Sequence, residues 1–200
     1  MAMQDIRAEA LALFARYGYE GTSLADIAKA VGIKTPSIYA HFASKDALYL
    51  AVLDWVLDEQ ERLLERSVGV PGTTEEKLKR MYVDFTAGYT SRTESMFYKR
   101  AIFFTPHHLL PVVREQVLRV ETRAAQAIGV VLEEGCRSGE LADIDRDEAT
   151  ASFFCLVDGM FVEHDLYEEE LYTRRLEQVW RVFWRGIAAH PKERKGDGEG

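Results

Sequence analysis

The stretch that decides the fold is TSLADIAKAVGIKTPSIYAHFASK, residues 22–45. Its first half places apolar side chains at the helical spacing i, i+3, i+4 and i+7, namely Leu24, Ile27, Ala28 and Val31. Ser23 and Asp26 have the spacing of a capping box, and Gly32 supplies the left-handed residue that commonly ends a helix. These signals predict a short helix between Ser23 and Gly32.

A second helix is predicted almost immediately after the first. Thr35 stands at the expected N-cap and Pro36 at the first helical position, where a missing amide hydrogen costs no hydrogen bond. Ile38 and Phe42 are four residues apart and are expected to turn inward. The outer face then carries Ser37, Tyr39 and His41. Two short helices joined by a glycine turn are typical of a helix-turn-helix, whose second helix enters the major groove of DNA.

The segment GYEGTSLADIAKAVGIKTPSIYAHFASKDAL, residues 18–48, resembles the DNA-binding domain of the TetR family of bacterial transcriptional regulators. The positions that carry the resemblance are Gly18, Thr22, Ile27, Ala28, Gly32, Tyr39, Phe42, Lys45 and Leu48. With the preceding helix, the similarity extends over about residues 6–53. It implies an all-α, TetR-like protein of about nine helices, in which a helical second domain binds an effector and dimerises.

The resemblance also implies which side chains face DNA. Phosphate contacts are common in the family at the positions of Thr22, Tyr39 and Lys45, while base edges are met at or near those of Lys34, Thr35, Pro36, Ser37 and His41. Because base contacts set sequence preference, we expect Lys34, Ser37 and His41 to read the operator. Ser23 completes the DNA-facing set. Taken singly, each of these residues could equally be a helix cap or an ordinary surface residue.

The distribution of charge agrees with DNA binding at one end of the chain. The net charge is −8, but residues 1–50 carry five basic and five acidic side chains, so the whole deficit lies beyond them. Between Ile27 and Lys45 there are three lysines, one histidine and no carboxylate. Screening limits the repulsion between the acidic remainder and phosphates to about 10 Å, so a local positive face is sufficient.

The rest of the chain is predicted to be helical, because apolar side chains recur at helical spacing and no strand pattern is present. Helices are expected over about residues 6–17, 45–66, 74–89, 112–137, 147–167 and 169–189, with a further one before Pro106. Thr73 and Glu76 form a second capping-box pattern. We expect a DNA-binding domain at residues 1–46, an effector-binding and dimerisation domain at residues 47–190 and a disordered tail at residues 191–200.

A small-molecule pocket is expected in the second domain, because aromatic residues gather in three of its segments. The candidate lining residues are Phe85, Tyr89, Phe103, His107, Phe154, Asp158 and Phe161. Asp158 interrupts an apolar stretch and would orient a cationic or hydroxyl-bearing effector. The alternative for the aromatic residues is an ordinary helical core, and for Asp158 a salt bridge or an exposed helix face.

The last two predicted helices carry more apolar surface than one chain can cover, which indicates a partner surface. A homodimer built from paired helices of two chains would use it, as the resemblance also implies. The candidate interface residues are Leu176, Trp180, Phe183 and Trp184, with Trp180 and Phe183 at the centre or as its immediate support. The two cysteines lack a CxxC spacing, and buried, reduced thiols are expected rather than a redox switch.

The chain is therefore expected to be a cytoplasmic transcriptional regulator without a membrane span, most often in this family a repressor that a small molecule releases from a palindromic, double-stranded DNA operator. The nearest alternative is a DNA-binding protein of the same fold whose second domain docks a protein partner. An enzyme is not expected, because the sequence has no G-x-S-x-G, phosphate-binding glycine loop or H-E-x-x-H motif. No cofactor, catalytic residue or metal site is expected either.

Overall fold

The computed structural model describes residues 3–87 and 92–189. Within these ranges the chain forms nine α-helices, and its extended pairing is limited to an isolated bridge between Leu141 and Ala188. The helices are α1 (Met3–Tyr17), α2 (Leu24–Val31), α3 (Thr35–Tyr39), α4 (Lys45–Val68), α5 (Thr74–Ala87), α6 (Arg92–Phe103), α7 (Leu110–Ser138), α8 (Arg146–Glu163) and α9 (Glu169–Ile187). The predicted all-α fold of about nine helices is confirmed within these ranges. The tail predicted for residues 191–200 lies outside the described ranges.

The local signals of the helix-turn-helix act as expected. The Ser23 hydroxyl accepts the Asp26 amide at the start of α2, and the Asp26 carboxylate accepts the Ser23 amide in return. Gly32 ends the helix with φ 77°, a conformation that favours glycine. The next boundary differs from the prediction by one residue. Lys34, not Thr35, is the N-cap of α3, with no side-chain cap bond, and α3 ends at Tyr39, so that His41 lies in the turn that follows.

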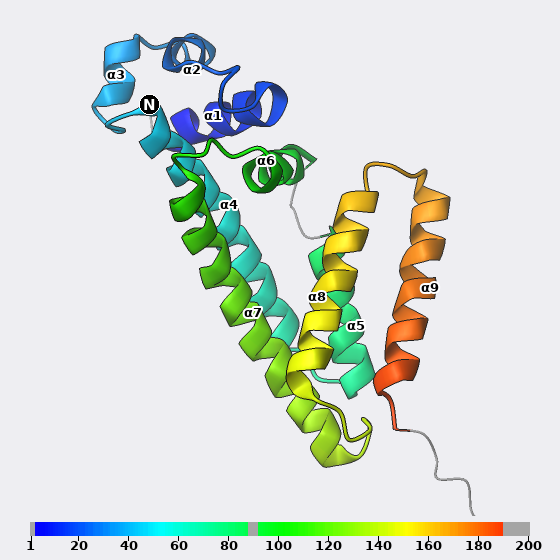
Figure 1. Cartoon of the computed structure of the whole chain (residues 1–200). Helices are drawn as coiled ribbons and strands as arrows, with labels where there is room; N and C mark the ends of the chain where they lie inside the picture. Colours follow the sequence, from blue (N-terminus) through cyan, green and yellow to red (C-terminus); the bar gives the residue numbers. More distant parts are fainter. Residues whose placement is uncertain (1–2, 88–91, 190–200) are drawn as a thin grey trace, which may run out of the picture.

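The first hydrophobic core reaches beyond the helix-turn-helix. Phe14 of α1, Tyr49 of α4 and Phe97 of α6 form one ring cluster, with centroids 5.1 Å apart for Phe14 and Tyr49 and 5.3 Å for Tyr49 and Phe97. Ala101 of α6 and Val113 of α7 are buried in the same core. Figure 1 shows α6 lying between α1 and the second half of the molecule. The DNA-binding end is therefore packed on α6 as well as on its own three helices.

The second core joins α5, α7, α8 and α9. Tyr82 of α5 stacks on Trp180 of α9 at 5.5 Å between ring centroids, and Phe153 of α8 meets Phe183 of α9 at 5.9 Å. The long helices α4 and α7 run side by side from the first core into the second (Figure 1). A displacement in the second core can therefore reach the DNA-binding end through continuous helices.

Two helix boundaries differ from those predicted by periodicity. Helix α8 ends at Glu163 rather than near Tyr167, and the Glu163 carboxylate receives both Nε and Nη2 of Arg175 from α9, each at 2.7 Å. Helix α7 begins at Leu110, because Pro111 is accommodated in its first turn. The expectation of buried thiols was wrong for Cys155, which is exposed on α8.

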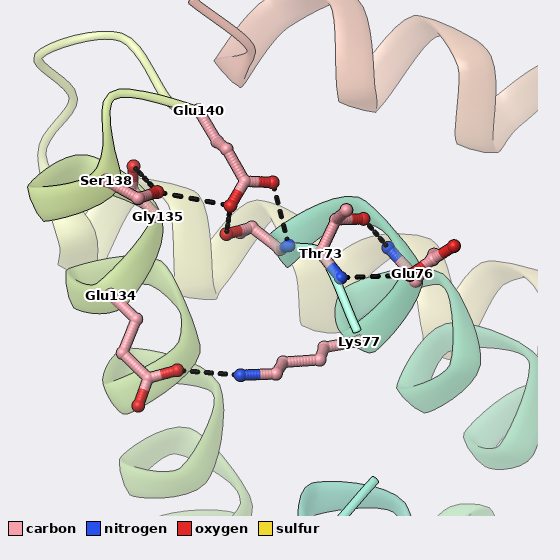
Figure 2. Close-up of polar contacts among 8 residues, drawn as sticks. Thr73, Glu76, Lys77, Glu134, Gly135, Ser138 and Glu140 are labelled. Carbon is pink, nitrogen blue, oxygen red and sulfur yellow. Dashed lines mark hydrogen bonds and ion pairs between the residues drawn. The ribbon is translucent and has the colours of Figure 1, made fainter. Parts of the chain in front are cut away.

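At the far end of the molecule, the carboxylate of Glu140 joins α5 to the end of α7 (Figure 2). Gly139 ends α7 in the left-handed conformation, at φ 80°, and Glu140 follows it. One oxygen of Glu140 accepts the Thr74 amide at 2.9 Å, and the other accepts the hydroxyls of Thr74 and Ser138 at 3.1 Å each. A residue distant in sequence thus satisfies an amide in the first turn of α5.

The neighbouring capping box supports the same turn. The Thr73 amide donates to Glu76 at 2.9 Å, and the Glu76 amide donates to the Thr73 hydroxyl at 3.2 Å, as the sequence predicts. Lys77 of α5, one helical turn after Thr73, pairs with Glu134 of α7 at 2.9 Å (Figure 2). The start of α5 is therefore fixed both within its own sequence and from α7.

Candidate nucleic-acid interface and ligand cavity

The candidate DNA-reading side chains gather around α3. Lys34, Pro36, Ser37, Tyr39 and His41 are all exposed, whereas Ile38 and Phe42 between them are buried. Tyr39 keeps 56% of its surface exposed although it is aromatic. Thr35 is half-buried, and Ser23 is exposed at the start of α2. Helices α2 and α3 form one extremity of the molecule, away from α8 and α9 (Figure 1). The residues of α3 and its flanks, 32–45, present cationic and hydrogen-bonding groups and contain no carboxylate, as contact with a groove of DNA requires, while the one carboxylate of α2, Asp26, accepts the Ser23 amide.

Thr22 has a structural role at the corner between α1 and α2. Only 2% of its surface is exposed, and its hydroxyl donates to the carbonyl of Gly18 at 2.9 Å, with Leu13 O also within reach at 3.2 Å. The Thr22 amide bonds to Tyr19 O. Both of its donors are thus satisfied within the chain, and the accessible surface of its side chain does not support a phosphate contact.

Lys45 is likewise held by the chain itself. Its ammonium donates to the carbonyls of Tyr19 at 3.0 Å and Thr22 at 3.2 Å, and it lies 3.9 Å from the centroid of the Tyr19 ring. An ammonium has three donors, so one remains for a phosphate. The Tyr19 hydroxyl donates to Asp46, and burial together with this carboxylate raises the pKa of Tyr19. These contacts fasten the loop before α2 onto the start of α4.

A cavity of about 290 Å³ lies between α4, α5, α6, α7 and α8. Four residues named from the sequence line it: Phe85, Phe154, Asp158 and Phe161. Their positions follow from helical periodicity, because Phe154, Asp158 and Phe161 recur on one face of α8. The volume is close to that of small-molecule sites, and most of the lining is apolar.

Two of the predicted lining residues, Phe103 and His107, lie away from the cavity. Phe103 is 61% exposed at the end of α6, and His107 is exposed in the turn that follows; neither belongs to the cavity wall. The side chain that α6 sends into the cavity at this level is Ile102, one residue earlier. Tyr89 lies outside the described residues. The rotation of α6 about its axis depends on its packing against α1, which the local sequence does not reveal.

Sequence reasoning missed Tyr98 and Ile102 of α6 and Glu121 of α7 as lining residues. A signal for Glu121 was present, since it directly follows Val120 in the apolar stripe of α7 and precedes Ala124 by three residues. Burial and the nearby Glu121 carboxylate both raise the pKa of Asp158 above its ordinary value. The charged groups that the described residues contribute to the cavity are therefore carboxylates.

Helix α6 forms part of both the cavity and the first core. Tyr98 and Ile102 line the cavity, while Phe97 and Ala101 are fully buried against the DNA-binding end. The two pairs alternate along the helix and lie on different faces of it. A ligand that moves Tyr98 or Ile102 would therefore move a helix on which α1 rests.

The candidate dimer residues divide into two groups. Trp180 and Phe183 are buried in the second core of their own chain, so they can support an interface but cannot form its surface. Leu176 and Trp184 are partly buried. The exposed apolar surface at this end instead includes Val162 at 41%, Leu166 at 70% and Val182 at 72% exposure.

An exposed helix-turn-helix on a helical body that contains an apolar cavity defines a class of DNA-binding regulator. Residues 6–52 match the family model described as bacterial regulatory proteins, tetR family. This stretch, less than half of the chain, is therefore similar to the DNA-binding domain of the TetR family of transcriptional regulators. Within residues 3–87 and 92–189, none of the helices has both the length and the apolar character needed to cross a membrane.

The curated proteins that share sequence with the chain include two kinds of bacterial regulator. The HTH-type transcriptional repressor ComR of Escherichia coli (strain K12) is 50% identical over 50 residues, which cover 25% of this chain and 24% of ComR. The biofilm operon icaADBC HTH-type negative transcriptional regulator IcaR of Staphylococcus aureus (strain Newman) is 33% identical over 97 residues, covering 34% of this chain and 52% of IcaR. The chain thus spans about a quarter to a half of the length of these relatives.

The likeness to solved structures covers nearly the whole chain. A protein from Saccharomonospora viridis, described as a transcriptional regulator in complex with choline, superposes with a TM-score of 0.79 at 21% identity. The superposition covers 94% of this chain and 97% of that one. At this identity, the likeness shows that the fold is shared.

Proposed function

We propose that the chain is a repressor that binds a palindromic DNA operator as a homodimer and is released from it by a small-molecule effector. The single observation that carries the proposal is the double role of α6, which lines the cavity with Tyr98 and Ile102 and underlies α1 with Phe97 and Ala101. In this arrangement a ligand in the cavity and DNA on α3 compete for the position of one helix.

DNA binding would use residues 1–46, with residues 47–190 as the effector-binding and dimerisation part. In a homodimer the two α3 helices must enter major grooves about 34–36 Å apart, or one further turn apart, which makes the operator palindromic. The exposed set around α3 supports Lys34, Ser37 and His41 as base readers and Tyr39 as a phosphate contact. Lys45 would add a contact through its remaining donor.

The dimer would form through α8 and α9. Cys155, Gly159 and Val162 are exposed at helical spacing on α8, and Val182 is exposed on α9. Two small residues in this row allow close approach of a partner helix, while the valines supply apolar area. Trp180 and Phe183 would hold this surface flat from beneath.

A small-molecule effector is favoured over a protein partner by the cavity itself. A second domain that only docked proteins would need no such cavity, yet about 290 Å³ of space lies among five helices. The choline complex of the Saccharomonospora viridis protein gives an example of a ligand bound by a protein of this fold. It supports the same type of regulation here without identifying the ligand.

The experiment that tests the proposal is a footprint on the DNA flanking the gene, followed by a ligand screen on the protein. A protected palindrome is expected, and His41→Ala should change preference at particular base pairs by about 1–3 kcal/mol. A ligand at about 100 times its Kd should stabilise the protein by about 2.7 kcal/mol and should release the operator. Failure to protect any sequence would reject the repressor assignment, whereas a protected operator that no cavity ligand releases would favour a protein partner.

A further inference from the structure

The cavity has carboxylates on two of its walls, and its lining within residues 3–87 and 92–189 includes no basic side chain. Glu121 is contributed by α7 and Asp158 by α8, and Gln60 of α4 adds an uncharged polar side chain. No Lys, Arg or His of the part of the chain that the structure describes belongs to the wall. An empty cavity of this composition has a negative potential, which repels anions and attracts cations.

The two carboxylates are placed there by helical phase. On α7, Val117, Val120, Glu121 and Ala124 share the cavity-facing side, and on α8 Phe154, Val157, Asp158 and Phe161 do the same. Neither carboxylate forms an ion pair within the described residues. They are close enough for the Glu121 charge to disfavour ionisation of Asp158. A cation placed between two like charges favours the ionised form of both.

The basic side chains around the cavity are already neutralised by other carboxylates. Lys99 of α6 lies 4.5 Å from the centroid of Phe161, but its ammonium is 2.6 Å from Asp165. Arg123 of α7 pairs with Glu61 of α4. Each of these cations has a nearer partner than the cavity carboxylates, so the negative charge of Glu121 and Asp158 is left for a ligand.

The remaining walls suit the body of an organic cation. Phe85, Tyr98, Phe154 and Phe161 present aromatic rings from three helices, and the negative face of an aromatic ring attracts ammonium groups. Both carboxylates lie at the exposed side of the cavity, where water screens them while the cavity is empty. A ligand that displaces this water would strengthen their attraction for its charge.

We infer that the effector is an organic cation, an amine or quaternary ammonium whose charge lies between Glu121 and Asp158 and whose apolar body lies among the aromatic rings. The inference rests on the proposed function for the role of the cavity, and it adds the chemical class of the ligand. An acidic surface that is merely solvated would also contain carboxylates, but it would not place them on the opening of an aromatic cavity.

The test uses three probes of the same shape and different charge. They are (3-hydroxyphenyl)trimethylammonium, its neutral counterpart 3-tert-butylphenol, and the anion 3-hydroxybenzenesulfonate. Binding to the full chain is measured by isothermal titration calorimetry. The cation should bind at least about tenfold more tightly than the neutral probe, and the anion should not bind. Glu121→Gln and Asp158→Asn should each weaken cation binding by about fivefold or more and leave the neutral probe unaffected.

Two further variants separate charge at this site from general charge and shape. Glu115→Gln removes an exposed carboxylate of α7 that is not in the cavity wall, and it should leave cation binding unchanged. Phe154→Leu keeps an apolar wall but removes an aromatic ring, and it should weaken binding of the cationic probe by about twofold to fivefold. Neutral binding equal to or tighter than cation binding, or no binding of any probe, would overturn the inference. Either result would leave the footprint of the operator, and thus the DNA-binding function, unaffected.

Discussion

Lys99 and Arg100 are consecutive residues of α6, and their side chains bind different parts of the molecule. Lys99 Nζ lies 2.6 Å from Asp165 Oδ2, beyond the end of α8. Arg100 Nε donates to the carbonyl of Ala15 in the last turn of α1 at 2.8 Å, and its Nη2 donates to Arg16 O at 3.2 Å. One peptide unit of α6 therefore connects the cavity end of the molecule with the DNA-binding end.

Replacement of Arg100 should loosen the contact between α6 and α1. Arg100→Met keeps an apolar stem of similar length but removes both charge-assisted hydrogen bonds, so the free energy of unfolding should fall by about 1–3 kcal/mol. Urea denaturation measures this loss. Arg92→Met on the same helix, at an exposed position, should change stability by no more than about 0.5 kcal/mol. Equal stabilities of the two variants would contradict a role for Arg100 in holding α1.

Lys45→Ala should affect both DNA binding and the helix-turn-helix. Loss of one phosphate contact in each protomer should flatten the slope of log K against log salt by about 1.8 for the dimer. The same variant should lower stability, because its ammonium bridges the carbonyls of Tyr19 and Thr22. Operator titrations over a salt series, together with denaturation, measure the two effects. A lower stability with an unchanged slope would assign Lys45 to the fold alone.

Val182→Glu should convert the proposed dimer into monomers, because a charge would enter the centre of the exposed α8–α9 surface. Sedimentation equilibrium measures the change, and tight operator binding should be lost with it. Leu118→Glu on α7 is the matched control, since this leucine is also exposed, at 57%. Phe183→Glu cannot serve, because Phe183 is buried and its loss would unfold the second core. A persistent dimer would place the interface elsewhere.

Glu140→Ala should destabilise the start of α5. The carboxylate accepts one amide and two hydroxyls, and the loss of these contacts should cost about 1–3 kcal/mol in the free energy of unfolding. Glu133→Ala is a suitable control, because its pairs with Arg137 and Arg146 are exposed and such pairs contribute at most about 1 kcal/mol. An equal loss of unfolding free energy in both variants would show that the Glu140 contacts stabilise the protein no more than an exposed ion pair does.

The raised pKa of Asp158 predicts that its ionised carboxylate lowers the stability of the ligand-free protein. Burial and Glu121 raise the pKa in the folded chain, so Asp158 favours folding at low pH and this contribution is lost as the pH rises through the raised value. Asp158→Asn should therefore make the empty protein more stable at neutral pH. Thermal unfolding of both proteins across a pH series would reveal it, and a less stable variant at neutral pH would contradict the prediction.

Local sequence signals predicted the helix-turn-helix almost residue by residue. The capping box of Ser23 and Asp26 and the left-handed Gly32 depend on neighbours within a few residues, so the sequence alone contains their cause. The aromatic composition of the second domain and the isolated Asp158 also singled out Phe154, Asp158 and Phe161, and all three line the cavity from one face of α8. The helix-turn-helix prediction rests on geometry that a single helix or turn determines by itself.

Contacts between distant segments were not accessible in this way. Lys45 and Thr22 have structural roles because the loop before α2 folds back onto α4. The error at Phe103 has a similar origin, since a rotation of α6 set by α1 places Ile102 in the cavity instead. Such positions depend on tertiary packing, and no pattern within α6 distinguishes the two residues.

The ring of Phe97 has a practical consequence for the construction of hybrid sensors. A hybrid that joined helices α1–α4 of this protein to the ligand-binding domain of another would lack Phe97. This α6 side chain packs against both Phe14 and Tyr49. The hybrid would then have a cavity in the first hydrophobic core, whichever ligand-binding domain was attached. Such a hybrid should therefore keep α6 together with α1–α4, or place residues equivalent to Phe97 and Ala101 on the attached domain.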